Sequence, residues 1–150
     1  MSDAVRAVLA DTSQLAEQHG AMRTELLVLR ARALRLRGRS LHEQGRAQPA
    51  LAAVNEGLAV CEEARTTGRG GLLQILAEQG ALDSLKARLL GTPAERGQAA
   101  ARAVSSLTAV LKERPPLGRE LEPYLRAAEP LLATAAPTVE ISLHTELEVR

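Results

Sequence analysis

The chain has 150 residues and a formal net charge of +1, from 19 Lys+Arg and 18 Asp+Glu, and this length suits one domain with its own core. Aromatic residues make up 1% of it and no apolar run approaches the ~18 residues of a membrane span, which argues against nucleic-acid and membrane partners. The single cysteine, Cys61, cannot form an intrachain disulfide. No secretory signal is visible, so we expect a cytoplasmic protein.

The composition favours helices, because 27 Ala and 26 Leu stand against 9 Val and 2 Ile. Apolar periodicity, interrupted by Gly and Pro, predicts six helices, at about residues 3–18, 22–44, 47–65, 72–90, 92–114 and 120–135. We expect His19-Gly20 to end the first helix and Thr92 to cap the fifth. Pro130 should kink the sixth helix or divide it into two short ones.

The last segment, residues 138–150, has a different period. Its odd positions are apolar or Thr, from Val139 to Val149, and its even positions are polar or charged. This alternation predicts a half-buried strand. One strand has no partner in a helical chain, so it pairs with another molecule, leads into a further domain, or forms a flexible tail.

The stretch Ala31 to Ala64 resembles a tetratricopeptide repeat. Its apolar and small residues match that pattern at Leu34, Gly38, Leu41, Gly45, Ala50, Val54 and Gly57. A weaker second copy, at about residues 82–113, follows after a shift of 48 or 49 residues. The resemblance implies an all-α, right-handed superhelical array of antiparallel helix pairs over residues 1–136, with residues 137–150 as a separate tail. A closed helical bundle is the alternative.

The sequence contains few residues of the types that carry out catalysis. It has three His, one Cys and one Tyr, and no spacing typical of a metal site or a phosphate-binding loop. Cys61 lies on the apolar stripe of the third helix, which indicates a core residue rather than a nucleophile. We therefore expect a protein that is not an enzyme and needs no cofactor or metal.

Positive charge is concentrated between Ala21 and Arg46, where seven Arg face two Glu for a local charge of +5. A helical spacing of three and four residues places Arg32, Arg35, Arg39 and His42 on one face. In the tetratricopeptide register this face lines the concave groove in which the family grips extended peptides. The resemblance thus implies a partner-binding site of Arg32, Arg35, Arg39 and His42, which Arg88 extends from the fourth helix. Arg suits a carboxylate because its planar guanidinium donates two parallel hydrogen bonds.

The leading hypothesis is therefore a protein–protein interaction module, an adaptor or scaffold, that binds an acidic or C-terminal peptide of a partner protein. Four alternatives remain open. The first is that the basic face is simply solvated, and the second is that the acidic residues 116–150, with a net charge of −3, cover it. The third is that the chain is a dimerisation or assembly domain of a larger bacterial regulator, with residues 138–150 joining two copies. The fourth is that it is a small helical-repeat chaperone of a secretion or assembly system.

Overall fold

The computed structural model describes residues 2–67 and 70–132, apart from the side chains of Leu9, Ser13, Ala16 and Glu17. These residues are all-α and contain no strand. Four long helices follow one another, α1 (Asp3–Glu43), α2 (Ala47–Thr67), α3 (Leu72–Leu89) and α4 (Pro93–Glu113). A 3-10 turn, η1 (Pro115–Leu117), then leads into a helical segment over residues 118–132. The predicted strand at 138–150 and the domain boundary at 136 lie outside the described residues.

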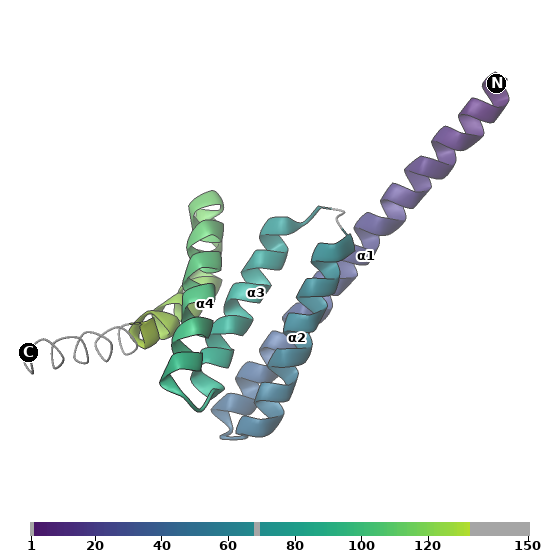
Figure 1. Ribbon diagram of the computed structural model, residues 1–150. Coiled ribbons are helices and arrows are strands. Elements are labelled where there is room, and N and C mark those ends of the chain that lie inside the picture. Colours follow the sequence, from purple (N-terminus) through teal and green to yellow (C-terminus); the bar gives the residue numbers. More distant parts are fainter. Residues whose placement is uncertain (1, 68–69, 133–150) are drawn as a thin grey trace, which may run out of the picture.

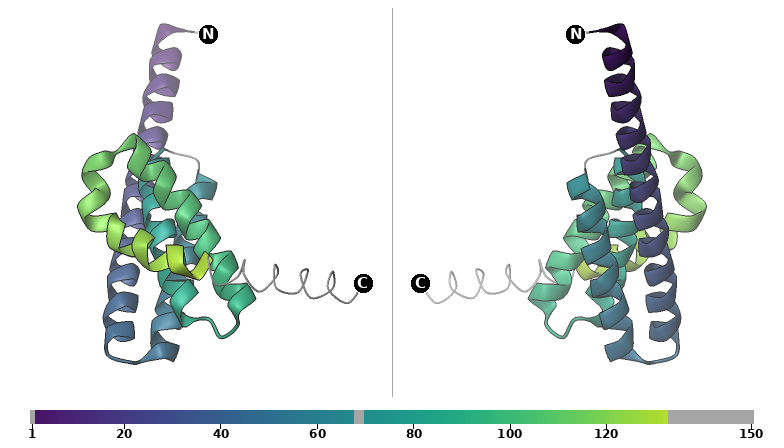
Figure 2. Two further views of the ribbon diagram at one scale, coloured as in Figure 1. Left: turned by 90° about the vertical axis from the view of Figure 1, so that its left-hand side faces the viewer. Right: turned by 90° about the vertical axis from the view of Figure 1, so that its right-hand side faces the viewer.

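Successive helices pack side by side in an open row rather than around one axis (Figures 1 and 2). α1 packs along α2, α2 and α1 both contact α3, and α3 packs along α4. No Cα atom of α1 or α2 comes within 8 Å of α4, whereas the first and last helices of a closed four-helix bundle touch. The four helices therefore form a layered array.

The interior lies between these layers and combines Ala residues with larger apolar side chains. Leu82 and Leu85 of α3 are completely buried, as are Val54 of α2 and Leu107 of α4. Two glycines let backbones approach closely. A Cβ on Gly38 would lie 2.9 Å from Val54 Cγ2, and one on Gly57 would lie 2.9 Å from Leu82 Cδ2. Larger residues at these two positions would force the helices apart.

Most predicted helix ends are confirmed, because local chemistry fixes them. Gly45 turns the chain between α1 and α2 with φ +75°, a conformation that L side chains rarely adopt. Thr92 Oγ1 accepts a hydrogen bond of 3.3 Å from Glu95 N at the start of α4. α4 ends at Glu113, and its C-cap Arg114 directly precedes the Pro115-Pro116 pair.

One predicted helix end is wrong, and so is the predicted division of the sixth helix. α1 runs through His19 and Gly20 as one helix, because a glycine within a helix costs only about 1 kcal/mol relative to alanine and nothing else stops the helix there. His19 is thus not at a helix end. Residues 118–132 stay helical through Pro130, so the sixth helix is not divided there. Pro130 lacks the N–H that would donate to the residue 126 carbonyl, and its ring crowds that carbonyl, so a kink at this position stays a prediction.

Candidate functional site

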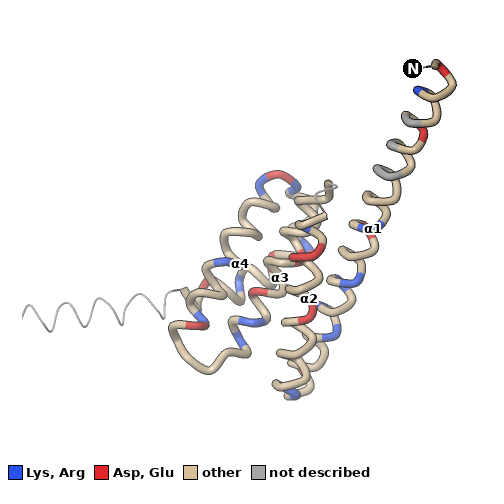
Figure 3. Tube along the Cα trace, turned by 45° about the vertical axis from the view of Figure 1, so that its right-hand side comes forward, with Lys and Arg blue, Asp and Glu red and all other residues tan. Residues whose placement is uncertain are grey.

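Apart from Arg6, the arginines of α1 lie between Arg23 and Arg39, where the helix runs beside the rest of the array (Figure 3). Arg32, Arg35, Arg39 and His42 share the face that looks onto α3 and the segment 118–132. Ala21, Glu25 and Val28 continue the same stripe toward the N-terminus at the same spacing. We call this row the α3-facing stripe of α1. It runs past two hollows, one at each end, with a buried ion-pair network between them.

Arg35 occupies the middle of the stripe and is 1% exposed. Its Nε donates to Glu78 Oε2 over 2.6 Å, its Nη2 donates to Glu120 Oε1 over 2.7 Å, and its Nη1 donates to the Tyr124 hydroxyl over 3.0 Å. Burial disfavours the charged guanidinium, but the hydrogen bonds and charge of Glu78, and then Tyr124, outweigh this, so the pKa of Arg35 is raised. Arg35 therefore joins α1, α3 and the segment 118–132.

Arg32 belongs partly to the same network. Its Nε donates to Glu78 Oε1 over 3.0 Å, while its side chain remains 46% exposed. Glu78 thus receives hydrogen bonds from two arginines, which compensates the burial of its carboxylate. Arg32 and Arg35 therefore both pair with Glu78 of the same chain in the absence of any ligand.

The other three predicted residues meet at the C-terminal ends of α1 and α3. Arg39, His42 and Arg88 line a small pocket of about 110 Å³. The remaining lining residues are Glu43, Pro123 and Tyr124. We call it the arginine pocket. The guanidinium of Arg39 lies over the Tyr124 ring, 5.7 Å from its centroid, and its Nε donates to Glu43 Oε1 over 3.1 Å.

Arg88 is the unusual member of the arginine pocket. Its Nε is buried and has no hydrogen-bond partner among the described residues. Burial, followed by repulsion from Arg39, lowers the pKa of the Arg88 guanidinium, although Tyr124 and Glu43 partly oppose this. A buried cationic donor without a hydrogen-bond partner destabilises the folded state, and an anion that binds to it removes this cost. The pocket is therefore suited to a carboxylate.

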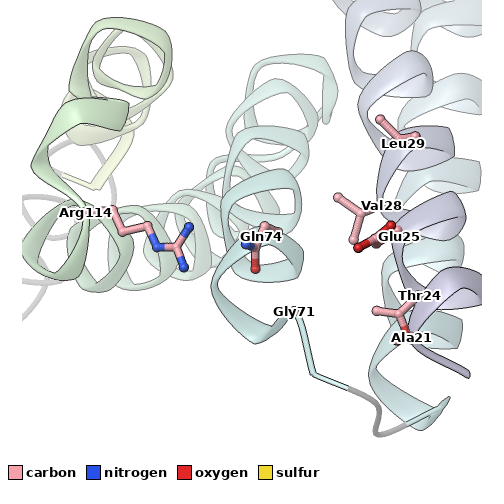
Figure 4. Close-up of a pocket in the computed structure, with 8 residues that line it drawn as sticks. All are labelled: Ala21, Thr24, Glu25, Val28, Leu29, Gly71, Gln74 and Arg114. Carbon is pink, nitrogen blue, oxygen red and sulfur yellow. The ribbon is translucent and has the colours of Figure 1, made fainter. Parts of the chain in front are cut away.

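The second hollow lies at the other end of the stripe and holds about 490 Å³. We call it the α1–α3 groove. Figure 4 shows Val28, Glu25 and Leu29 on the α1 side, with Gln74 of α3 and Arg114 on the opposite side. Ala21, Thr24 and Gly71 complete its lining. The groove offers apolar contact to a ligand and one charge of each sign.

Other kinds of site find no support in the part of the chain that the structure describes. No group of three His, Cys, Asp or Glu side chains there is placed to hold a metal ion. Cys61 is 2% exposed, and burial raises the pKa of its thiol to about 12, so it is a core residue, as its position on the apolar stripe predicted. None of the helices in this part combines the length and apolar character needed to cross a bilayer.

Sequence reasoning named three residues of the arginine pocket and missed the others. Tyr124 and Pro123 come from a segment more than 80 positions beyond Arg39. Glu78, the partner of Arg35, carried no signal in the sequence, because it lies 43 positions away in a different helix. The α1–α3 groove was missed as well, although the spacing of Ala21, Glu25 and Val28 continues that of the predicted arginines.

No protein-family model, curated protein or solved structure matches this chain.

Proposed function

We propose that the chain is a non-enzymatic protein–protein interaction module that binds the C-terminal carboxylate of an acidic peptide in the arginine pocket. The observation that carries this proposal is the buried, unpartnered Nε of Arg88 in a pocket that Arg39 and His42 share. A carboxylate accepts several hydrogen bonds from guanidinium groups and compensates their charge. Glu43 already pairs with Arg39, so the ligand has to outcompete an exposed carboxylate, and exposed ion pairs are weak.

The remainder of the peptide would follow the α3-facing stripe of α1. Leu29, in the α1–α3 groove, and Arg39, in the arginine pocket, are ten residues apart on one helix, or about 15 Å. An extended peptide covers this distance in about five residues. Arg32 lies between the two hollows with half of its side chain exposed, and a second acidic residue of the peptide is placed to reach it. Apolar contacts in the groove would supply most of the affinity.

In this proposal Arg35 keeps its place in the site without touching the ligand. Its donors are engaged by Glu78, Glu120 and Tyr124, so it fixes the helices that carry the arginine pocket. The open row of helices and the close approaches at Gly38 and Gly57 agree with a tetratricopeptide-like array, which is the fold that we infer. A cytoplasmic location belongs to the same proposal.

A test uses hexapeptides that end in Asp or Glu, carry fluorescein at the N-terminus, and exist in free-carboxylate and amidated forms. Fluorescence anisotropy should give at least tenfold tighter binding of the free carboxylate. The double variant R39Q/R88Q should lose roughly a hundred- to ten-thousandfold in affinity, because it removes two charged hydrogen bonds that contribute about 1.5–3 kcal/mol each. Equal affinity for the two peptide forms would overturn the proposal.

The matched control is R126Q, because Arg126 forms an exposed i,i+4 pair with Glu122 and its side chain is 79% exposed. It removes one positive charge outside the arginine pocket, so it should leave peptide affinity within twofold of the wild type. A loss of affinity in R126Q as large as in R39Q/R88Q would mean that net charge, rather than the pocket, holds the peptide.

A further inference from the structure

The N-terminal part of α1 stands clear of the other helices (Figures 1 and 2). Every described side chain from Ser2 to His19 is exposed. Nevertheless this part is not polar all round, since Val5, Val8 and Leu15 are 49–64% exposed. Large apolar side chains on an unpacked helix indicate an interaction surface.

These residues belong to a row that extends along most of α1. The described large apolar side chains of α1 that are exposed are Val5, Val8, Leu15, Met22, Leu26, Leu29 and Leu36. All seven fall on the a and d positions of one heptad repeat, with a at 5, 12, 19, 26 and 33 and d at 8, 15, 22, 29 and 36. The repeat passes through Gly20 without a change of phase. We call it the heptad row; it spans about 46 Å.

Apart from Leu29, which borders the α1–α3 groove, the heptad row lies on the opposite side of α1 from the array. The side chains that α1 buries include Thr24, Leu27 and Ala31, which are offset by two residues from Met22, Leu26 and Leu29. Two residues correspond to about 200° around a helix. α1 thus has two apolar faces, one covered by α2 and α3 and one uncovered, so a second helix can dock on the heptad row without disturbing the fold.

The a positions that are not large and apolar still tolerate burial. Thr12 Oγ1 already donates to the Val8 carbonyl over 2.8 Å, which satisfies its hydroxyl within the helix. Ala33 is small, and His19 is the only ionisable residue in the row. A single polar a position commonly fixes register at some cost in stability.

We propose that the heptad row binds a second copy of this chain, with the two α1 helices packed as an antiparallel coiled coil. An antiparallel pair matches each a position with a d position of the other copy, so Ala33 meets Val8, Thr12 meets Leu29, and His19 meets Met22. Every such pair of facing a and d residues then contains at least one large apolar side chain. A parallel pair would place Ala33 against Ala33 and His19 against His19. The row is therefore self-complementary in the way that a twofold interface requires.

The charges beside the row favour the same arrangement. The g positions directly precede the a positions. In the antiparallel pair, Asp11 of each copy lies opposite Arg32 of the other copy, so this attractive pair forms twice, and Gln18 lies opposite Glu25. The parallel pair would gain Glu25 opposite Arg30 but would also set Arg32 opposite Arg37. In the antiparallel dimer, residues 3–19 of each copy also lie along the C-terminal half of the other copy's α1. Each protruding segment is thereby covered.

The test is the oligomeric state of the full chain by sedimentation equilibrium. The wild type should be a dimer at 100 µM, and L15E/M22E should raise the dimer dissociation constant at least a hundredfold while circular dichroism stays unchanged. The matched control is L72E, because Leu72 is 57% exposed but lies on α3, and it should remain dimeric. H19L should tighten the dimer. A monomeric wild type, or a dimer that L15E/M22E leaves intact, overturns the proposal.

Disulfide cross-linking tests the orientation. A mixture of V8C and A33C chains should cross-link under air oxidation, whereas V8C alone should not; self-cross-linking of V8C would overturn the antiparallel arrangement. Val8, Leu15 and Met22 line neither the arginine pocket nor the α1–α3 groove, so these variants leave the peptide site unchanged. Because Leu29 and Arg32 belong to both surfaces, the dimer is measured without peptide.

Discussion

Arg35 and Glu78 form an ion pair in the interior of the array, with 2.6 Å between Nε and Oε2 and side chains only 2% and 3% exposed. They lie on α1 and α3, and Tyr124 stacks against the same guanidinium at 5.3 Å from its ring centroid. A buried pair of this kind fixes which helix faces meet, since any slip along α1 would leave two charges without partners.

Removing one member of this pair should destabilise the protein far more than removing both. We expect E78M or R35M to lower the free energy of unfolding by about 3 kcal/mol, because each removes the buried partner of the remaining charge. The loss stays at the low end of the usual range of about 3–5 kcal/mol, because Glu120 still pairs with Arg35, and Arg32 still pairs with Glu78. The double variant R35M/E78M should cost much less than the sum of the single changes. Urea unfolding followed by circular dichroism measures all the variants. Additive losses would show that the two side chains act independently.

Gly80 marks a close approach of α3 and α4. A Cβ at this position would lie 2.8 Å from Leu107 Cγ and 3.2 Å from Ser106 Cβ, and Leu107 is completely buried. G80A should therefore destabilise the protein, because overpacking costs about 1–3 kcal/mol and exceeds the roughly 1 kcal/mol gain in helix propensity. We expect a lower melting temperature by calorimetry.

The matched control for Gly80 is Gly118, which is also helical. A Cβ on Gly118 would meet only the Glu122 side chain, at 3.8 Å or more. G118A should keep or raise the melting temperature, because helix propensity then acts alone. If G80A and G118A shifted the melting temperature in the same direction, the close contact with Leu107 would not be limiting.

The parts of the fold that the sequence predicted correctly depend on neighbouring residues. Thr92, Pro93 and Glu95 start α4 through a hydrogen bond between residues three positions apart. Gly45 and the Pro115-Pro116 pair act through their own backbone restrictions. Gly20 was misjudged because glycine only lowers helix propensity, and the heptad row that passes through it was therefore divided between two predicted helices.

The candidate site was predictable only in part. The helical period correctly places Arg32, Arg35, Arg39 and His42 on one face, and the structure brings Arg88 to the same end as Arg39. The period does not distinguish a buried guanidinium from an exposed one. That difference depends on Glu78, Glu120 and Tyr124, whose positions follow from tertiary packing rather than from local sequence.

Cys61 provides a probe of opening motions. Burial raises the pKa of its thiol to about 12, with smaller contributions from the negative charges of Glu78 and Asp83. At pH 8 the native protein should therefore react with iodoacetamide at least a hundredfold more slowly than the urea-unfolded chain. Mass spectrometry of timed samples gives both rates. Equal rates would mean that α2 leaves the array readily.

Asp83 should make stability depend on pH in the direction opposite to that of a typical ion-paired carboxylate. It is 2% exposed, and its Oδ2 has no hydrogen-bond partner among the described residues. Burial raises the pKa of this carboxyl above its ordinary value of 3.8, and Arg102, 3.5 Å from Oδ1, only partly opposes this.

The folded state consequently holds this proton more tightly than the unfolded chain does. The resulting stabilisation is complete below pH 3.8 and is lost as pH rises through the pKa of the folded state, by about 1.4 kcal/mol for each tenfold difference in proton affinity. D83N cannot titrate, so its stability relative to the wild type should increase as pH rises from about 4 to 7. Urea unfolding of both proteins across this range measures the difference. A relative stability of D83N that falls with pH would show that Arg102 outweighs burial and lowers the pKa of Asp83.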